Sequence, residues 1–240
     1  QAGVLLTVRL CLAELGLADR VPAQAPAPLA EYVRLLLEKN QVMNLPAIRE
    51  PDQVARLHML DCAALLQEGD FAGKQLIDVG TGAGFPGLPL KILEPSLTVT
   101  LLDSLGKRVT WLGTVCEALS LDKIACLHAR GEEQAHEAGF RDSFDYAVSR
   151  AVASLEVLSE LCLPYVKVGG KFLAMKSVDS GDEVDRAARA IAKLGGRLLP
   201  RVDYTIPHTG VTHRVVVVEK VSPTPQGYPR RWARIQKSPL

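Results

Sequence analysis

The sequence predicts an α/β fold: an open, twisted, mostly parallel sheet that ends in an antiparallel hairpin and is preceded by a helical extension. Three observations support this class. From residue 75 onward, short apolar runs alternate with segments of helical periodicity, which is the pattern of successive βαβ units. The chain has 240 residues, enough for one large α/β domain with a short extension. A short connection joins the last two apolar runs, and it cannot hold a helical crossover, so these runs should be antiparallel.

Residues 1–66 are expected to form the helical extension. The apolar stretch from Val4 to Leu17 is interrupted by Arg9 and Glu14 and has no small-residue cleavage pattern, which indicates an amphipathic helix rather than a signal peptide. Apolar side chains at positions 29, 32, 33, 36 and 37 fall on one face of a second helix. A third helix is expected from Pro51, a residue favoured in the first turn, up to Gly69.

Seven strands and five helices are expected after the extension. The strands are residues 75–79, 98–102, 123–127, 144–148, 171–175, 197–203 and 213–220, and the helices are residues 86–94, 105–119, 132–138, 153–166 and 180–195. Gly169 and Gly170 break the chain before the fifth strand. Pro200 restricts the sixth strand to an edge or bulged position because proline has no amide hydrogen to donate. Residues 67–222 are therefore assigned to the sheet domain and residues 223–240 to a basic tail.

Composition and charge narrow the function classes. Hydrophobic residues make up 48% of the chain and charged residues 23%, which is typical of a folded domain. Five scattered cysteines without a Cys-x-x-Cys pair suggest neither a disulfide framework nor a metal site, and a reducing, cytoplasmic compartment fits best. No stretch is long enough to cross a membrane. The net charge is only +1, but basic residues gather after residue 197, so this end could touch phosphates or simply be a solvated surface.

The loop after the first strand contains two overlapping glycine patterns that fit different ligands. The stretch from Gly82 to Gly87 matches G-x-G-x-x-G, the pattern of dinucleotide sites. Read from Asp78, the pattern adds a carboxylate, which would repel a pyrophosphate but suits the cationic sulfonium and ammonium groups of S-adenosylmethionine. Asp103, at the end of the second strand, could bind the ribose hydroxyls of either ligand. The loop favours S-adenosylmethionine over NAD and leaves open a turn that binds no cofactor.

An open sheet that ends in a hairpin is familiar from class I (Rossmann-like) methyltransferases, and several motifs point to one family of them. In order along the chain, these motifs are "NQVMNLPAI", "HMLDCAALL", "LIDVGTGAGFPGLPLKI", "LLDSLGKRVTWL", "ARGEEQA", "FDYAVSRAVASL", "GGKFLAMKS" and "THRVVVVEK". Together they resemble the RsmG (GidB) family, which methylates guanine N7 in bacterial small-subunit ribosomal RNA. The resemblance runs from about residue 29 to residue 220 and departs at Cys62, Ser177, Trp232 and Gln236.

The resemblance implies S-adenosylmethionine as cofactor and small-subunit ribosomal RNA, or a subunit particle, as partner. It also implies the cofactor-binding residues Gly80, Gly82, Gly84 and Phe85 on the methionine side, Asp103 at the ribose, Gly131 and Glu132 at the adenine, and Arg150 beside the reacting groups. Each has a structural alternative: the glycines as a plain turn, Asp103 and Glu132 as helix caps, and Arg150 in an ion pair with an acid such as Asp145. His58 and Asp61 share a helix face and are read as a structural pair.

The chemistry expected at the site is alignment rather than proton transfer. Guanine N7 has a free lone pair and no proton, so no general base is expected, and Ser149 and Arg150 are assigned positioning roles. Lys176, Arg214, Arg230 and Arg231 are candidates for RNA contact, with ordinary surface positions as the alternative. A monomer is expected. Two other functions stay open at this point: an NAD-dependent oxidoreductase, and a non-catalytic, cofactor-binding RNA assembly factor.

Overall fold

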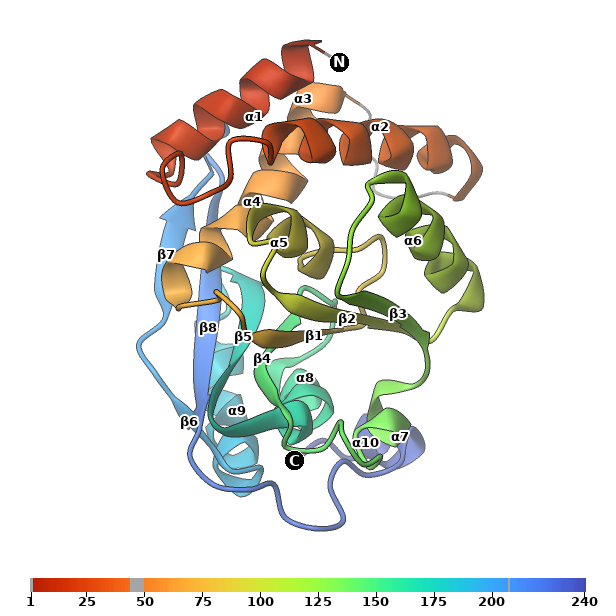
Figure 1. Cartoon of the computed structure of the whole chain (residues 1–240). Coiled ribbons are helices and arrows are strands. Elements are labelled where there is room, and N and C mark those ends of the chain that lie inside the picture. Colours follow the sequence, from red (N-terminus) through yellow and green to blue (C-terminus); the bar gives the residue numbers. More distant parts are fainter. Residues whose placement is uncertain (1, 44–49, 207) are drawn as a thin grey trace.

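Eight strands form one mostly parallel sheet in the computed structural model, which describes residues 2–43, 50–206 and 208–240 (Figure 1). The parallel strands are β1 (Gln75–Val79), β2 (Thr98–Asp103), β3 (Ile124–His128), β4 (Phe144–Ser149) and β5 (Val166–Ser177). The remaining strands are β6 (Gly196–Leu198), β7 (Val202–Thr205) and β8 (Thr212–Lys220), and β8 runs antiparallel to β5, β6 and β7. The strand order is β3-β2-β1-β4-β5-β8-β6, with β7 also paired to β8. The predicted fold class, an open and mostly parallel sheet closed by an antiparallel hairpin, is confirmed.

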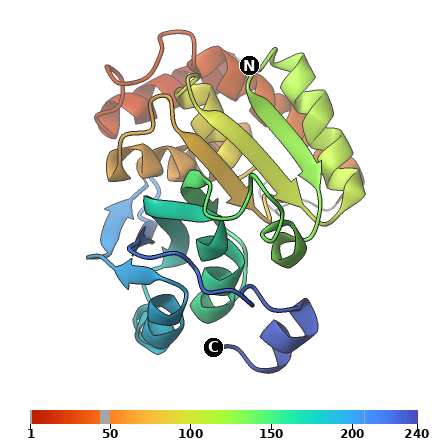
Figure 2. The same ribbon diagram turned by 60° about the horizontal axis from the view of Figure 1, so that its bottom comes forward.

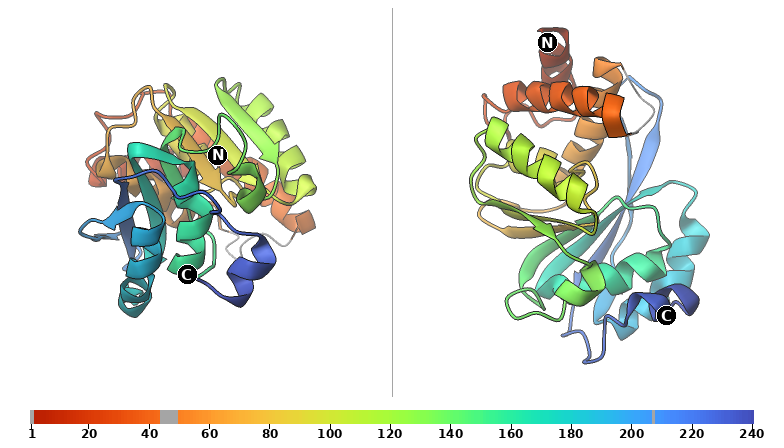
Figure 3. Two further views of the ribbon diagram at one scale, coloured as in Figure 1. Left: turned by 90° about the horizontal axis from the view of Figure 1, so that it is seen from below. Right: turned by 90° about the vertical axis from the view of Figure 1, so that its right-hand side faces the viewer.

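Helices cover both faces of this sheet because its parallel strands are apolar on both sides. Side chains alternate between the two faces along each strand: Leu76, Leu101 and Leu173 belong to one buried cluster, and Ile77, Leu102 and Phe172 to the other. Helices α5 (Gly87–Leu93) and α6 (Gly106–Ala118) pack on the first face. Helices α8 (Leu155–Cys162) and α9 (Gly181–Lys193) pack on the second, as Figure 3 shows from the side. The short helix α7 (Gly131–Gln134) follows β3.

The N-terminal helices extend the core of the first face. Helix α1 (Ala2–Glu14) and helix α2 (Pro26–Met43) lie over α5, and residues from both belong to the same buried cluster as the sheet. Val8 and Tyr32 are fully buried in that cluster, together with Leu90 and Leu112 of α5 and α6. The helical extension and the sheet therefore share one hydrophobic core. Residues 44–48 of the "NQVMNLPAI" motif lie outside the described residues.

The third predicted helix is present but changes pitch along its length. It consists of α3 (Pro51–Val54), a π-helical turn η1 (Ala55–Leu60), α4 (Asp61–Ala63) and the 3₁₀ turn η2 (Ala64–Glu68). π-Helical turns are rare and occur often at functional sites, because the extra residue re-aims the side chains that follow. Here the turn carries His58 and ends just before Asp61. Both side chains enter the site described below.

Two predicted segments differ from the structure at the C-terminal side. The sixth strand, predicted over residues 197–203, is split into β6 and β7, which pair with different halves of β8. Pro200 lies in the gap, where its missing amide hydrogen cannot continue the ladder. Gly169 and Gly170 do not break the fifth strand but lie inside β5, at a bulge in its pairing with β4. The predicted tail also contains a short helix, α10 (Trp232–Lys237).

The topology places the site at the carboxyl ends of the strands. The strand order reverses between β1 and β4, and ligands of open α/β sheets bind in the crevice outside such a switch point. The loops that follow β1, β2, β3 and β4 all emerge at this edge because the strands are parallel. None of the helices in the described parts of the chain is long and apolar enough to cross a membrane.

Candidate functional site

A cavity of about 420 Å³ opens at the carboxyl ends of β1, β2 and β3; we call it the Asp103 cavity. Its walls are mainly apolar and include Val79, Leu102 and Leu158, while Asp103 and Glu132 supply carboxylates. An apolar slot with a few fixed polar groups is typical of small-molecule sites. The chemistry of this lining fits a nucleoside, whose ribose donates hydrogen bonds and whose base is flat and apolar on its faces.

Asp103 is held rigidly at the floor of this cavity. Its Oδ2 accepts from the amide of Gly82 at 2.9 Å, and its Oδ1 accepts from the amide of Leu105 at 2.9 Å. Arg108 lies 3.8 Å from Oδ1. Because each carboxylate oxygen accepts more than one hydrogen bond, Asp103 keeps acceptor capacity for a ligand. Its position suits the predicted ribose contact, and it is not the N-cap of α6, where Leu105 stands.

Asp78 has a different role from the one predicted. Its carboxylate is fully buried beneath the glycine loop, where Oδ2 accepts from Thr81 Oγ1 at 2.7 Å and from the amide of Gly87 at 2.8 Å. Burial raises the pKa of Asp78 to about 7. The expectation that this carboxylate faces the cofactor is therefore wrong, because its strand position directs it toward α5 with Leu76. Asp78 ties the loop to the start of that helix, and only a glycine fits at position 87, where a Cβ would lie 2.9 Å from Asp78 Cβ.

Helix α2 also fixes the glycine loop. The Tyr32 hydroxyl donates to the carbonyl of Ala83. Gly84 has φ +103°, and a Cβ there would collide with the same hydroxyl at 2.4 Å, so both its conformation and its surroundings require glycine. Of the predicted loop residues, Gly80 lines the Asp103 cavity. Phe85 instead stacks on His58, with ring centroids 5.2 Å apart.

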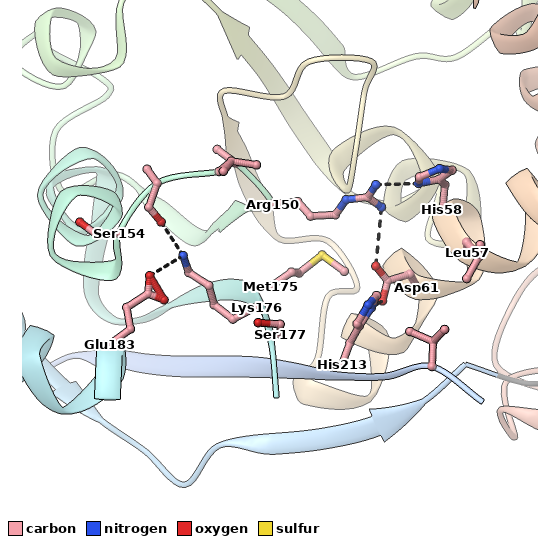
Figure 4. A pocket seen from close by; sticks show the side chains of 14 residues that line it. Leu57, His58, Asp61, Arg150, Ser154, Met175, Lys176, Ser177, Glu183 and His213 are labelled. Atoms are coloured by element: carbon pink, nitrogen blue, oxygen red, sulfur yellow. Dashed lines mark hydrogen bonds and ion pairs between the residues drawn. The ribbon is translucent and has the colours of Figure 1, made fainter. Parts of the chain in front are cut away.

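A larger cavity of about 800 Å³ lies beside the first, at the ends of β4 and β5; we call it the Arg150 cavity (Figure 4). The charged and titratable side chains that line it are His58, Asp61, Arg150, Lys176, Glu183 and His213. Ala151 lines both cavities. The two spaces therefore adjoin at the loop that follows β4.

Arg150 is surrounded by four side chains, one of which is Cys62, whose Sγ lies 3.9 Å from Nη1. Its Nη2 donates to His58 Nδ1 at 2.6 Å, and its Nη1 lies 3.6 Å from Asp61 Oδ2 (Figure 4). Its guanidinium also lies over the Phe85 ring, 4.8 Å from the centroid. The alternative partner named from the sequence, Asp145, is wrong. That carboxylate pairs with Lys167 at 2.5 Å and accepts from a backbone amide at the opposite end of the strand.

His58 and Asp61 hold Arg150 from two sides. Burial, with a further contribution from the Arg150 charge, lowers the pKa of His58 to about 4, so at neutral pH its Nδ1 is a free acceptor. Asp61 also accepts from the hydroxyl of Tyr204 and from His213 Nδ1 at 2.9 Å. That hydrogen bond raises the pKa of His213. The predicted structural pair, His58 and Asp61, is thus linked through Arg150, which both side chains contact.

A family model described as rRNA small subunit methyltransferase G matches residues 26–205. The chain belongs to this family. Curated relatives with the same description include one from Clostridium beijerinckii, 44% identical over 211 residues and covering 88% of each chain. Another, from Alkaliphilus metalliredigens, is 45% identical over 213 residues, covering 88% of this chain and 89% of the relative. The resemblance drawn from the sequence motifs is confirmed, and membership of a methyltransferase family decides against the nicotinamide-dependent oxidoreductase.

Solved structures share the fold. The branched-chain polyamine synthase from Thermus thermophilus aligns with TM-score 0.61 at 14% identity, covering 86% of this chain and 66% of that chain. TrmN from Thermus thermophilus aligns with TM-score 0.53 at 24% identity, covering 68% and 49%. TYW2 from M. jannaschii, solved in complex with AdoMet, aligns with TM-score 0.54 at 14% identity, covering 68% and 76%. At these identities the likeness shows the fold.

The other residues predicted for the site lie in different places. Ser149 is fully buried, and its Oγ accepts from the amide of Ala151 at 3.2 Å, so it supports the loop and lines neither cavity. Gly131 and Glu132 line the Asp103 cavity, where Glu132 pairs with Arg130 at 2.6 Å. Their placement suits the predicted adenine contact.

The candidate RNA-binding residues also lie in different places. Lys176 lines the Arg150 cavity and pairs with Glu183 at 3.0 Å. Arg214 donates to Asp203 at 2.7 and 3.1 Å. Arg230 is bound to a buried carboxylate and anchors the tail, which differs from the RNA contact predicted for it. Arg231 is exposed.

Sequence reasoning missed Tyr204 and His213, which complete the site from β7 and β8. Tyr204 and His213 lie 143 and 152 residues after Asp61, so no local sequence pattern links either residue to Asp61. One signal was available in "THRVVVVEK". There His213, a titratable residue, stands directly before Arg214, which was predicted to bind phosphate.

Proposed function

We propose that this chain transfers a methyl group from S-adenosylmethionine to N7 of a guanine in small-subunit ribosomal RNA. One observation carries the proposal: a nucleoside-sized cavity with a fixed carboxylate meets a larger, charge-lined cavity at Ala151. A donor in the first space and a nucleotide in the second would face each other there. The relatives named rRNA small subunit methyltransferase G supply the substrate class.

The residues of the Asp103 cavity fit the donor. Asp103 would accept the ribose hydroxyls, and Gly131 and Glu132 would flank the base. S-Adenosylmethionine supplies an electrophilic methyl group on its sulfonium. The protein supplies alignment, because Asp103 is oriented by two backbone amides before any ligand arrives.

The residues of the Arg150 cavity fit a reaction that needs no proton transfer. Guanine N7 attacks with a lone pair that carries no proton, so the site requires no base. His58 and Asp61 are the obvious candidates for one, but both are engaged with Arg150. Arg150 would contact a guanine oxygen or a phosphate and must leave N7 free. We assign it a positioning role, held in place by His58 and Asp61.

The target guanine should lie in a loop or be splayed out of a helix. N7 faces the major groove, which is deep and narrow in A-form RNA and closed to side chains. We also propose that the chain acts as a monomer in the cytoplasm, where ribosomal subunits are made. Sedimentation equilibrium of the purified chain tests the first part of this statement.

The direct test is methyl transfer to ribosomal RNA that lacks the modification. Small subunits and naked RNA from a strain deleted for the protein would be incubated with tritiated S-adenosylmethionine, and the product mapped by mass spectrometry. We expect one labelled guanine, modified at N7. Label on another atom would contradict the N7 assignment. RNA binding without any label would favour the non-catalytic assembly factor.

A further inference from the structure

The C-terminal segment is fastened to the domain by a buried ion pair. Glu160 of α8 is buried with 1% of its side chain exposed, and Arg230 binds it through the backbone amide at 2.7 Å and through the guanidinium at 2.7 to 3.2 Å. A buried carboxylate is costly unless it is paired and hydrogen-bonded, so this contact fixes the position of residue 230. Figure 2 shows the segment running from β8 past α8 to α10.

Two other side chains bind the backbone that leads to this ion pair. Arg141 donates to the carbonyls of Tyr228, Thr224 and Pro225 at 2.6 to 3.0 Å. His136 Nε2 lies 2.7 Å from the carbonyl of Pro229. The backbone just before α10 is therefore bound along most of its length.

This fixed segment brings Trp232 to the donor site. Trp232 begins α10, two residues after the anchor, and its side chain lines the Asp103 cavity. It also lines a neighbouring space of about 290 Å³, so it lies between the two spaces together with Arg130 and Glu132. Among the described residues that line the Asp103 cavity, Trp232 is the single aromatic one.

We propose that Trp232 is a cofactor-contacting residue whose indole forms one wall of the Asp103 cavity against the adenine of S-adenosylmethionine, which makes the C-terminal segment part of the donor site. This inference rests on the proposed function for the identity of the ligand. An aromatic face beside a flat base gains by stacking, and base–aromatic stacking is tolerant of exact ring position. The rest of the lining supplies aliphatic contacts and carboxylates but no other π surface among these residues.

Tryptophan fluorescence tests the proposal because the chain has two tryptophans, Trp111 and Trp232. Trp111 lies on α6 against Tyr32, and it does not line the cavity. In the variant Trp111→Phe, the remaining emission comes from Trp232 alone. We expect saturating S-adenosylhomocysteine to quench or shift that emission. The same titration of Trp232→Phe, which keeps Trp111, should show little change.

Calorimetry with S-adenosylhomocysteine measures the contribution to binding. Trp232→Ala should raise the Kd about tenfold, and Trp232→Phe should recover most of that loss because it keeps an aromatic face. Arg234→Ala, on an exposed position of α10, is the matched control and should leave the Kd unchanged. Thermal unfolding reports whether each variant is folded.

The outcomes separate this inference from the proposed function. If the unaltered chain binds S-adenosylhomocysteine but the emission of Trp111→Phe does not change at saturation, the inference is wrong and the proposed function stands. If the unaltered chain binds no S-adenosylhomocysteine, the proposed function fails, and this inference fails with it. The fluorescence result decides even if Trp232→Ala does not fold, because Trp111→Phe leaves residue 232 intact.

Discussion

The two cavities of this methyltransferase differ in how the chain builds them. The Asp103 cavity is lined mostly by consecutive strand ends and loops, from Val79 to Glu132, so its polar groups lie close in the sequence. The Arg150 cavity draws His58 from the helical extension, Arg150 from the loop after β4 and His213 from β8. The first is a local product of βαβ units, and the second requires the whole fold. A binding site for a common cofactor can thus be read from motifs, while the substrate site depends on distant contacts.

If the Asp103 cavity binds the donor and the Arg150 cavity positions the substrate, Arg150→Ala should lower the rate of methyl transfer far more than the affinity for the donor. We expect the rate of methyl transfer to small subunits to fall about a hundredfold, because a misplaced nucleophile loses the advantage of alignment. The Kd for S-adenosylhomocysteine should change less than about threefold, since Arg150 does not line the Asp103 cavity. Arg34→Ala, on the surface of α2, serves as the control. Equal losses in binding and rate would contradict the division.

Asp78 supports the glycine loop under the Asp103 cavity, and the pH dependence of the unfolding free energy tests whether its carboxylate is buried there. Its pKa is raised from 3.8 to about 7 in the folded chain, so the unfolded chain loses this proton first as pH rises. The stability contribution of Asp78 is present below its unfolded pKa and is lost as pH rises toward 7. Asp78→Asn removes that loss.

The expected size follows from the shift. Between pH 5 and pH 8, the unfolding free energy of Asp78→Asn should rise relative to the unaltered chain by about 2 kcal/mol. Urea unfolding at both pH values measures this difference. The exposed Asp19→Asn should show no such change. Parallel curves for Asp78→Asn and the unaltered chain would mean that the buried carboxylate has an ordinary pKa.

Asp103→Asn should affect the donor and spare the substrate. The loss of a charged acceptor for the ribose hydroxyls should weaken S-adenosylhomocysteine about tenfold. At saturating S-adenosylmethionine the transfer rate should return to within about threefold of the unaltered rate, because the lost contact is made in the ground state as well. Steady-state kinetics at varied donor concentration provides the measurement. A rate that stays low at saturation would place Asp103 in the alignment machinery.

The smallest expected effect is that of pH on the rate. No group in the Arg150 cavity has to remove a proton, and the pKa of His58 lies at about 4, far below the working range. The single-turnover rate should therefore vary less than about threefold between pH 6 and pH 9. Rapid-quench assays with the chain in excess over small subunits would report it. A tenfold rise with one pKa that persists in His213→Gln, which removes the raised pKa of that side chain, would require an essential base and would count against N7 chemistry.

The alternation of short apolar runs with segments of helical periodicity predicted the parallel strands, because turn-forming residues mark where each apolar run ends. These patterns did not give the direction of Asp78, although strand alternation contains that information: Ile77 and Val79 share one face, so Asp78 points to the other with Leu76. The contact of His58 and Asp61 with Arg150 could not be predicted, since a π-helical turn carries His58 and two later strands hold Asp61. The tail was expected to be a basic arm, and the structure anchors it on Glu160 instead.

The central claim is that methyl transfer occurs where the two cavities meet, and Ala151 lines both of them. Enlarging this residue by Ala151→Leu should narrow the junction without removing a polar contact from either side. We expect S-adenosylhomocysteine and small subunits each to bind within a few-fold of the unaltered chain, while single-turnover transfer falls by at least about tenfold. Full transfer by a folded Ala151→Leu variant would show that the reaction takes place elsewhere.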